Sequence, residues 1–280
     1  MTTDRITTFG RSKIQHGKHS DRVYLMHLAA ADLAGIVPYL ETLASREGYS
    51  KIFAKIPVAA EAAFLQNGYR AEAAIPGFYR GEQAALFMGK YFTEERRQEQ
   101  HPRLVELALQ AARAKAQPAG RPTLEPHLTS RRLGPADTEA MAALYRQVFA
   151  SYPFPIHDEN YLRQTMGENV IYFGVWEEDV LLALASAEID EHGANAEMTD
   201  FATRPDCQGR GLANYLLVRT EEIAAQLGVK TTYTIARSYS PAMNITFARN
   251  GYAYSGTLTH NTQIFGTLES MNVWYKALPL

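Results

Sequence analysis

Residues 196–213, AEMTDFATRPDCQGRGLA, run from a strand-like segment into a helix through a turn that contains two glycines. Free backbone N–H groups at a helix start lie at the positive end of the helix dipole, and glycines allow phosphate oxygens to approach the main chain. A P-loop would need Gly-Lys-Ser/Thr after this turn, and a Rossmann turn would need a third glycine where Asn214 stands. The stretch therefore predicts a pyrophosphate-binding turn that fits neither nucleotide motif.

The segments on both sides of this turn predict a mixed α/β fold. Two helices follow the turn, at residues 212–227 and 241–250, and each ends at a glycine. Hydrophobic residues at periods of two and of 3.6 place the other elements. Strands are expected at 127–132, 170–176, 180–189, 196–203, 229–236, 252–258 and 271–277, and further helices at 138–149 and 160–166.

Residues 117–126, QPAGRPTLEP, form the clearest boundary in the chain, because three prolines and a glycine interrupt the helical pattern. We expect an N-terminal domain at 1–117, a linker at 118–126 and a C-terminal domain at 127–280. The N-terminal domain is expected to contain strands at 23–28, 51–56, 69–75 and 84–92, a helix that Asp32 caps, and helices at 58–67 and 103–116.

A short internal similarity links the two domains. Residues 64–69, FLQNGY, match residues 247–252, FARNGY, and each hexapeptide follows a predicted strand and precedes two more. Two interpretations are open. The hexapeptides can share only a helix C-cap followed by an aromatic residue, or the N-terminal domain can be a partial copy of the second half of the C-terminal domain.

The bulk composition excludes several classes of protein. A net charge of −2 lacks the basic excess that is typical of nucleic-acid binding. The polar N-terminus has no apolar signal-peptide core, and no stretch approaches about 18 apolar residues, so we expect a cytoplasmic protein with no membrane partner. The single cysteine, Cys207, cannot form an internal disulfide, and the eight histidines lack metal-ligand spacing, which predicts no bound metal.

The glycine turn carries a family resemblance. Gln208-x-x-Gly211-x-Ala213 resembles the Arg/Gln-x-x-Gly-x-Gly/Ala signature of the Gcn5-related N-acetyltransferases (GNAT), and the surrounding element order is similar to the acetyl-CoA half of that superfamily. Other stretches, in both domains, resemble the β-lysine N-acetyltransferases that work with a lysine 2,3-aminomutase. These stretches are residues 51–57, 74–81, 197–203, 233–238, 243–254 and 269–276.

This resemblance implies a C-terminal GNAT fold with an N-terminal partial GNAT-like domain. It also implies an acyltransferase that moves acetyl from acetyl-CoA to the terminal amine of β-lysine, giving Nε-acetyl-β-lysine, a compatible solute in osmoadaptation. Three alternatives stay open, namely another small amine, a protein lysine or N-terminus, and a non-catalytic acetyl-CoA sensor. The sequence does not fix the oligomeric state, for which a dimer is one expectation.

The proposed chemistry requires a base, because an alkylammonium with a pKa of ~10.4 is protonated at neutral pH and cannot attack a thioester. Glu197 and Asp200 lie on the strand before the turn, and strand alternation places them on opposite faces unless a bulge intervenes. By resemblance we favour Glu197, because the histone-acetylating branch has its glutamate base eleven residues before the position of Gln208. Phe247 stands where many GNAT enzymes have a tyrosine that serves as the general acid, so Tyr252, Asn244, Tyr275 or a water would have to protonate the thiolate.

The remaining candidates bind the two substrates. The cofactor-binding set consists of the end of the strand, the turn, and the next strand-to-helix junction: Phe201, Ala202, Thr203, Gln208, Gly209, Arg210, Gly211, Leu212, Ala213, Asn214, Arg237 and Asn244. A cationic amino acid needs acidic groups for its amines and a donor for its carboxylate. From resemblance and chemistry together, the substrate-binding set is Glu72, Tyr79, Arg80, His260, Asn261, Thr262 and Glu269.

Overall fold

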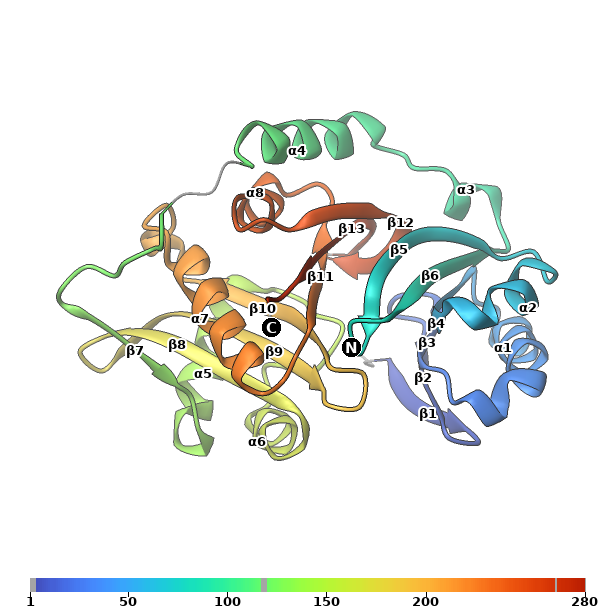
Figure 1. Cartoon of the computed structure of the whole chain (residues 1–280), viewed down its shortest axis with the longest axis horizontal. Helices are drawn as coiled ribbons and strands as arrows, with labels where there is room; N and C mark the ends of the chain where they lie inside the picture. Colours follow the sequence, from blue (N-terminus) through green and yellow to red (C-terminus); the bar gives the residue numbers. More distant parts are fainter. Residues whose placement is uncertain (1–3, 117–119, 265, 280) are drawn as a thin grey trace.

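The computed structural model describes residues 4–116, 120–264 and 266–279. It contains two mixed β-sheets, one in each half of the chain, whose strands meet near the centre of the molecule (Figure 1). The expected mixed α/β class is confirmed. In the described part of the chain, no helix has the length and apolar character needed to cross a membrane.

The N-terminal sheet has six strands in the order β1-β2-β3-β4-β6-β5, with β3 and β4 parallel and the other neighbours antiparallel. Helices α1 and α2 cover its outer face (Figure 1). The sequence did not predict β1 and β2, which are short and rich in polar residues. The elements are β1 Arg5–Phe9, β2 Ser12–Gly17, β3 Arg22–His27, α1 Leu33–Glu47, β4 Lys51–Pro57, α2 Glu61–Leu65, β5 Arg70–Tyr79, β6 Gln83–Tyr91, α3 Glu94–Arg97 and α4 Pro102–Ala114.

The C-terminal sheet has seven strands in the order β12-β13-β11-β10-β9-β8-β7, in which only β10 and β11 are parallel. Each predicted strand and helix of this half is present, with ends displaced by a few residues. The elements are β7 Leu128–Arg132, α5 Thr138–Val148, α6 Glu159–Glu168, β8 Val170–Glu177, β9 Val180–Asp190, β10 Asn195–Thr203, α7 Leu212–Gln226, β11 Thr231–Arg237, α8 Pro241–Arg249, β12 Ala253–Ile264 and β13 Thr267–Ala277.

The two sheets have the same topology. The order β1-β2-β3-β4-β6-β5 corresponds strand for strand to β8-β9-β10-β11-β13-β12, and α1 and α2 correspond to α7 and α8. The hexapeptides at 64–69 and 247–252 fall at the same place, where α2 leads to β5 and α8 leads to β12. This topology supports the partial-copy interpretation, and the copied unit is larger than the sequence suggested because it includes counterparts of β8 and β9.

The start of α1 differs from the start of α7, its counterpart. No glycine occurs in residues 27–33, which connect β3 to α1. The carboxylate of Asp32, just before α1, accepts hydrogen bonds from the backbone N–H groups of Arg11 and Ser12, both at 2.8 Å. Hydrogen bonding by the Ser12 hydroxyl lowers the pKa of Asp32, so this helix start carries a fixed negative charge. Asp32 therefore bonds to the β1–β2 turn, although the sequence predicted a cap on the helix.

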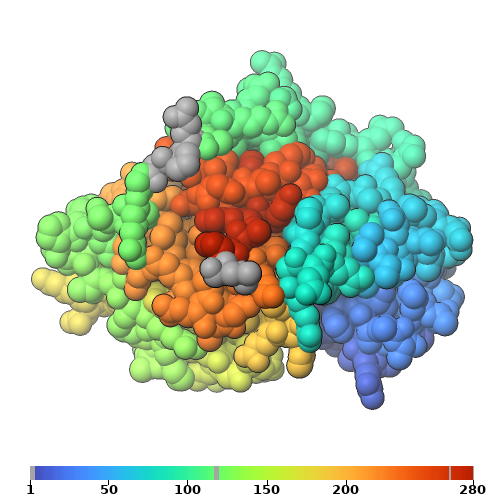
Figure 2. Space-filling view, in the orientation of Figure 1, coloured from blue at the N-terminus to red at the C-terminus, as the bar shows by residue number. Residues whose placement is uncertain are grey.

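The inner faces of the two sheets enclose a shared apolar core. Strand alternation directs Val23 of β3 toward α1 and Tyr24 toward the C-terminal domain. Tyr24 stacks on Phe53, with ring centroids 4.6 Å apart, and both belong to a cluster that includes Tyr233 of β11 and Val273 of β13. Figure 2 shows the resulting contact, where the cyan N-terminal strands lie directly against the orange and red C-terminal ones.

Helix α4 crosses the proposed domain boundary. It runs along the top of Figure 1 beside α8, and its residues Val105, Leu109 and Ala112 are buried in the same cluster as Phe247 and Ala248 of the C-terminal half. The sequence placed this helix in the N-terminal domain, but its packing assigns it to the C-terminal core. The linker at 118–126 stays a prediction, and residues 117–119 lie outside the described part of the chain.

Candidate active site

A gap between two parallel strands creates the site. β10 and β11 pair only from Asn195 to Glu197 on one strand and from Thr231 to Tyr233 on the other, although both strands continue further. Beyond this point they separate. The diverging segments line a cavity of about 1230 Å³ that extends to the N-terminal domain. On the β11 side its lining includes Thr234, Ile235, Ala236, Arg237, Ser240, Met243 and Phe247.

A β-bulge in β10 brings the two candidate bases into this cavity. The pairing with β9 shifts register between Thr199 and Ala202, and Asp200 within the bulge has φ of +51°. A bulge changes which face the following side chains occupy. Glu197 and Asp200, which simple alternation would place on opposite faces, therefore both line the cavity.

The Asp200 carboxylate is held by three hydroxyl groups. Ser186 donates to it at 2.6 Å, Thr199 at 3.3 Å, and the hydroxyl of Tyr152 donates to its Oδ1 atom. Burial raises the pKa of Asp200, and these hydrogen bonds oppose that shift. Because its oxygens already accept these hydrogen bonds, Asp200 is better suited to contributing negative charge to the cavity lining than to accepting a proton.

Glu197 combines partial exposure to the cavity with a perturbed pKa. Burial raises the pKa of Glu197 to about 7, Lys55 opposes this shift, and the neighbouring carboxylate of Glu188 adds to it. Glu188 lies directly opposite Glu197 in the β9–β10 register, and Tyr233 lies beside it on β11. Lys55 Nζ donates to the Tyr233 hydroxyl at 3.0 Å. A carboxyl group with a pKa near neutrality is suited to general base catalysis.

The glycine turn fits an anion. Gly209 and Gly211 have φ of +82° and +78°, and a Cβ atom at either position would have no neighbour within 4 Å. Gly211 is the N-cap of α7. In the described part of the chain, the backbone N–H groups of residues 209–213 donate no hydrogen bond. Buried Cys207 and Leu212 anchor the two ends of the turn, so its free donors and open space match a pyrophosphate group.

Arg210 lies within this turn, and its side chain has a protein partner. Its Nε donates to Glu125 Oε1 at 2.9 Å. The guanidinium of Arg210, which the sequence analysis assigned to cofactor binding, thus pairs with a carboxylate at the surface. Ion pairs at exposed positions are weak.

Asn244 has a different role from the predicted one. It is fully buried and is absent from the cavity lining. Its Nδ2 donates to the carbonyls of Arg237 (2.9 Å) and Ser240 (2.7 Å), and its Oδ1 accepts from Asn272 Nδ2 (2.9 Å) and Trp274 Nε1 (2.8 Å). These four bonds use the full capacity of the amide. Asn244 therefore fastens α8 to β11 and β13, and contact with a cofactor is not available to it.

Tyr252 does not reach the cavity. Its ring is buried and packs edge-on against Phe247 with centroids 5.0 Å apart, and Phe247 lines the cavity whereas Tyr252 does not. Burial raises the pKa of Tyr252 well above its ordinary value. The prediction that Tyr252 donates the proton to the thiolate is therefore not supported by the geometry, and Phe247 has no proton to give.

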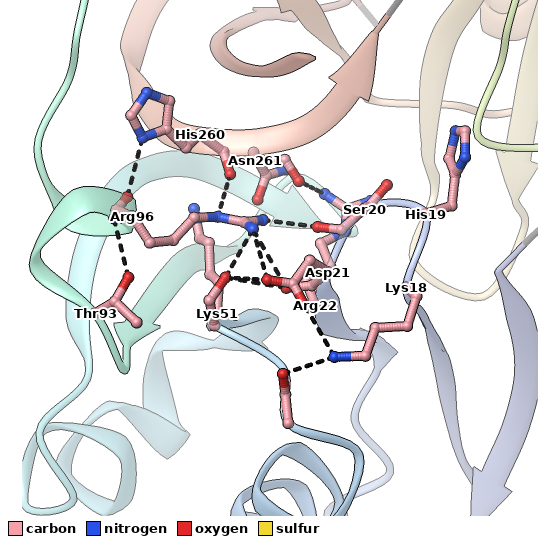
Figure 3. A network of polar contacts seen from close by, with 12 residues as sticks. Lys18, His19, Ser20, Asp21, Arg22, Lys51, Thr93, Arg96, His260 and Asn261 are labelled. Carbon is pink, nitrogen blue, oxygen red and sulfur yellow. Dashed lines mark hydrogen bonds and ion pairs between the residues drawn. The ribbon is translucent and has the colours of Figure 1, made fainter. Parts of the chain in front are cut away.

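Three predicted substrate residues lie in the domain interface instead. Glu72 accepts from Lys51 Nζ at 2.9 Å and from the backbone of Thr259 at 3.0 Å. Glu269 forms a two-bond pair with Arg237, at 2.9 and 2.7 Å. His260 is buried, with its ring 3.2 Å from the carbonyl of Arg96 (Figure 3). None of the three lines the cavity, because long-range contacts that the sequence does not reveal hold them elsewhere: ion pairs hold Glu72 and Glu269, and hydrogen bonds hold His260.

The other four predicted substrate residues do line the cavity, and they are Tyr79, Arg80, Asn261 and Thr262. Asn261 and Thr262 lie in a bulged part of β12, beyond residue 258, where the sequence predicted that this strand would end. Burial raises the pKa of Tyr79 to about 12, so its hydroxyl stays protonated. Arg80 is exposed, and its Nε donates to the carbonyl of His192 at 2.9 Å.

Sequence reasoning missed Arg22, Tyr24, Lys55 and Glu188, which all line the cavity. Each lies on or next to a predicted strand, but the register between strands decides which side chains meet. One signal was present. Glu188 and Glu197 stand on successive strands of a predicted hairpin, so an antiparallel pairing could have placed them together.

Comparison with known proteins identifies the class of protein that has the separated strands, the bulge and the glycine turn described above. Residues 139–252 match the Acetyltransferase (GNAT) family, and this span contains the separated strands, the bulge and the glycine turn. The C-terminal domain is thus an acetyltransferase domain of the GNAT class.

Relatives extend this similarity to both domains. The chain is 36% identical to the β-lysine N(6)-acetyltransferase of Methanococcus maripaludis, with 98% of each chain covered. It is 31% identical to the N-acetyltransferase YodP of Bacillus subtilis, with 95% of each covered. A β-lysine N(6)-acetyltransferase of Methanosarcina mazei is 41% identical over 51% of this chain and 53% of that one. The chain belongs to the β-lysine N(6)-acetyltransferase family.

Proposed function

We propose that the protein transfers the acetyl group of acetyl-CoA to the terminal amine of β-lysine, giving Nε-acetyl-β-lysine. The observation that carries this proposal is the 36% identity to the Methanococcus maripaludis enzyme over 98% of the chain. That similarity includes the N-terminal domain, which forms one wall of the cavity. A GNAT domain alone would support acetyl transfer but not this choice of amine.

The cavity supports a free amino acid over a protein substrate. Its lining comes from both domains, with Tyr24 and Phe53 on one side and Glu188 and Glu197 on the other. Such an enclosure suits a small molecule, whereas a peptide segment needs an open groove. The carboxyl groups of Glu188, Glu197 and Asp200 in the cavity lining also match a substrate that carries two ammonium groups.

Acetyl-CoA supplies an activated acetyl thioester to this site. The free N–H groups of residues 209–213 are placed to hold the pyrophosphate, with the positive end of the α7 dipole behind them. The unpaired edges of β10 and β11 offer backbone groups to the pantetheine arm, beginning with residues Phe201, Ala202 and Thr203. These features direct the reactive end toward the cavity.

Glu197 is the residue that we assign as the general base. Near neutral pH it is divided between its two protonation states, so it can accept a proton from the substrate ammonium directly or through an ordered water. The freed amine then attacks the thioester carbonyl, a C–N bond forms, the C–S bond breaks, and the CoA thiolate leaves and takes up the second proton that the nitrogen loses as it becomes an amide. Glu188 and Asp200 hold the ammonium in place without taking its proton.

The test uses the purified protein with acetyl-CoA and measures release of the CoA thiol. We expect turnover with β-lysine, slower turnover with α-lysine, and none with a lysine-containing peptide. Mass and NMR analysis of the product should place the acetyl group on the terminal nitrogen. Binding of acetyl-CoA without thiol release for any of these amines would contradict the proposal and support a sensor.

We also propose that the reaction takes place in the cytoplasm and that its product accumulates under salt stress as a compatible solute. This follows from the chemistry of the product, a zwitterion whose terminal ammonium has been neutralised. Deletion of the gene should lower the Nε-acetyl-β-lysine content of cells grown at high salt. Unchanged content would contradict this role.

A further inference from the structure

Arg22 stands apart from the other buried cations of the protein. It lies at the start of β3, on the face of the N-terminal sheet that meets the C-terminal domain, and only 5% of its surface is exposed. Its guanidinium lies over the rings of Tyr24 and Phe53, 5.2 and 5.8 Å from their centroids. Its Nη1 donates to the carbonyl of Asn261 and, at 3.2 Å, to the hydroxyl of Thr262. The head group is thereby fixed in position at the cavity wall.

The guanidinium has no acidic partner among the residues that the structure describes. Two neighbouring cations do have one. Lys51 pairs with Glu72 at 2.9 Å, and Arg96 pairs with Asp21 at 3.5 Å (Figure 3). No described carboxylate lies within 4.0 Å of Arg22, and its buried Nε makes no hydrogen bond with the described residues. A buried charge without a counter-ion is unfavourable, so a natural site for an anionic ligand exists here.

The opposite wall of the cavity carries the complementary charge. Glu188 and Glu197 are adjacent on β9 and β10, and Asp200 follows in the bulge. The cavity thus has a fixed cation on its N-terminal wall and carboxylates on its C-terminal wall. A molecule with a carboxylate at one end and an ammonium at the other matches both walls.

We propose that Arg22 binds the carboxylate of the amino acid substrate and that the N-terminal domain thereby selects amino acids over simple amines. Neither Nε, which is buried, nor Nη2 donates to a described residue, and these two groups form the edge from which a guanidinium donates two parallel hydrogen bonds to a carboxylate. This inference rests on the proposed function and names the group that recognises the substrate.

Other cations at the cavity are less suitable. Lys55 donates to the Tyr233 hydroxyl and is close enough to Glu197 to influence its pKa, so a carboxylate bound there would be repelled by the base. Arg237 already forms a two-bond pair with Glu269. Arg80 is exposed at the rim. Arg22 alone combines burial, fixed geometry and the lack of a described carboxylate partner.

The experiment compares β-lysine with 1,4-diaminopentane, which is β-lysine without its carboxylate and keeps both amines at the same spacing. We expect the wild-type protein to prefer β-lysine in kcat/KM by about 100-fold, a typical effect of a buried two-bond charge pair. In Arg22→Gln this preference should fall to about one, through loss of activity on β-lysine with little change on the diamine. Arg22→Lys should retain part of it, because an ammonium binds a carboxylate as a point charge.

Arg96→Gln is the matched control, because it removes a buried arginine from the same interface that does not line the cavity. It should lower thermal stability and leave the substrate preference unchanged. A wild-type protein that acetylates the diamine as well as β-lysine overturns the inference without any variant. A folded Arg22→Gln that keeps the full preference also overturns it. No wild-type turnover of β-lysine would instead contradict the proposed function.

Discussion

Replacing Glu197 by glutamine should stabilise the protein at alkaline pH while removing its base. The ordinary glutamate pKa is 4.5, and burial raises that of Glu197 to about 7 in the folded protein. Below pH 4.5 the carboxyl is neutral in both the folded and unfolded states. Between 4.5 and about 7 it ionises in the unfolded state first, so folding stability falls as the pH rises through this window.

The size of this effect follows from the shift in pKa. At ~1.36 kcal/mol for each pKa unit, ionised Glu197 destabilises the folded protein by about 3 kcal/mol above pH 7. Glu197→Gln should therefore be more stable than wild type by up to about 3 kcal/mol at pH 8 and nearly equal to it at pH 4.5. Urea unfolding at the two pH values measures the difference. The exposed Glu106 offers a control, since Glu106→Gln makes the same chemical change at the surface.

The activity of the same variant tests the assignment of the base. In the wild type, kcat/KM should rise about tenfold per pH unit below pH 7 and level off above it, because only ionised Glu197 accepts a proton. The glutamine variant should lose this inflection and about 10²- to 10⁴-fold of the rate. Unchanged turnover from pH 6 to 9, or a stability difference that is the same at both pH values, would refute the reasoning.

Further substitutions test the scaffold around the site. Gly211→Ala places a side chain at a positive φ in the open space of the turn. It should lower the free energy of unfolding by about 1 kcal/mol and raise the KM for acetyl-CoA. An unchanged KM would argue against a pyrophosphate there. Asn244→Ala removes four buried hydrogen bonds and should lower unfolding free energy by about 2–4 kcal/mol in urea titrations, whereas a loss below about 1 kcal/mol would contradict its fastening role. Lys51→Met leaves Glu72 buried without its counter-ion and should lower the free energy of unfolding by about 3–5 kcal/mol. Adding Glu72→Gln should recover much of this loss. Equal losses in the single and double variants would show that the pair is not coupled.

Local sequence signals predicted the catalytic half of the fold well. The strand, the glycine turn and the helix that follows are encoded within residues 196–213, because glycine spacing and hydrophobic period act over a few residues. Both candidate bases were also found there. Their common orientation was not predictable, since it depends on the bulge at Asp200, a backbone irregularity with no distinct residue signature.

Features that depend on contacts between distant segments could not be predicted. Lys51 and Glu72 appear in the sequence as ordinary strand residues, and only the pairing of β4, β5 and β6 buries them together. Arg22 meets Asn261 across 239 positions of the chain. Tertiary packing of this kind overrides what a short window of sequence indicates, and the same limit explains why the sequence did not reveal the ion pairs of Glu72 and Glu269.

The negative charge at the start of α1 bears on how this protein family can diversify. One copy of the repeated unit has the glycine turn at its helix start and the other has Asp32, so we expect a single chain to bind a single molecule of acetyl-CoA. The N-terminal half carries neither the glycine turn nor the proposed base, so we expect that its inner sheet face can change without altering the cofactor-binding turn. Relatives that act on different amines should therefore differ most on β3 and β4, two strands through which the N-terminal sheet lines the cavity.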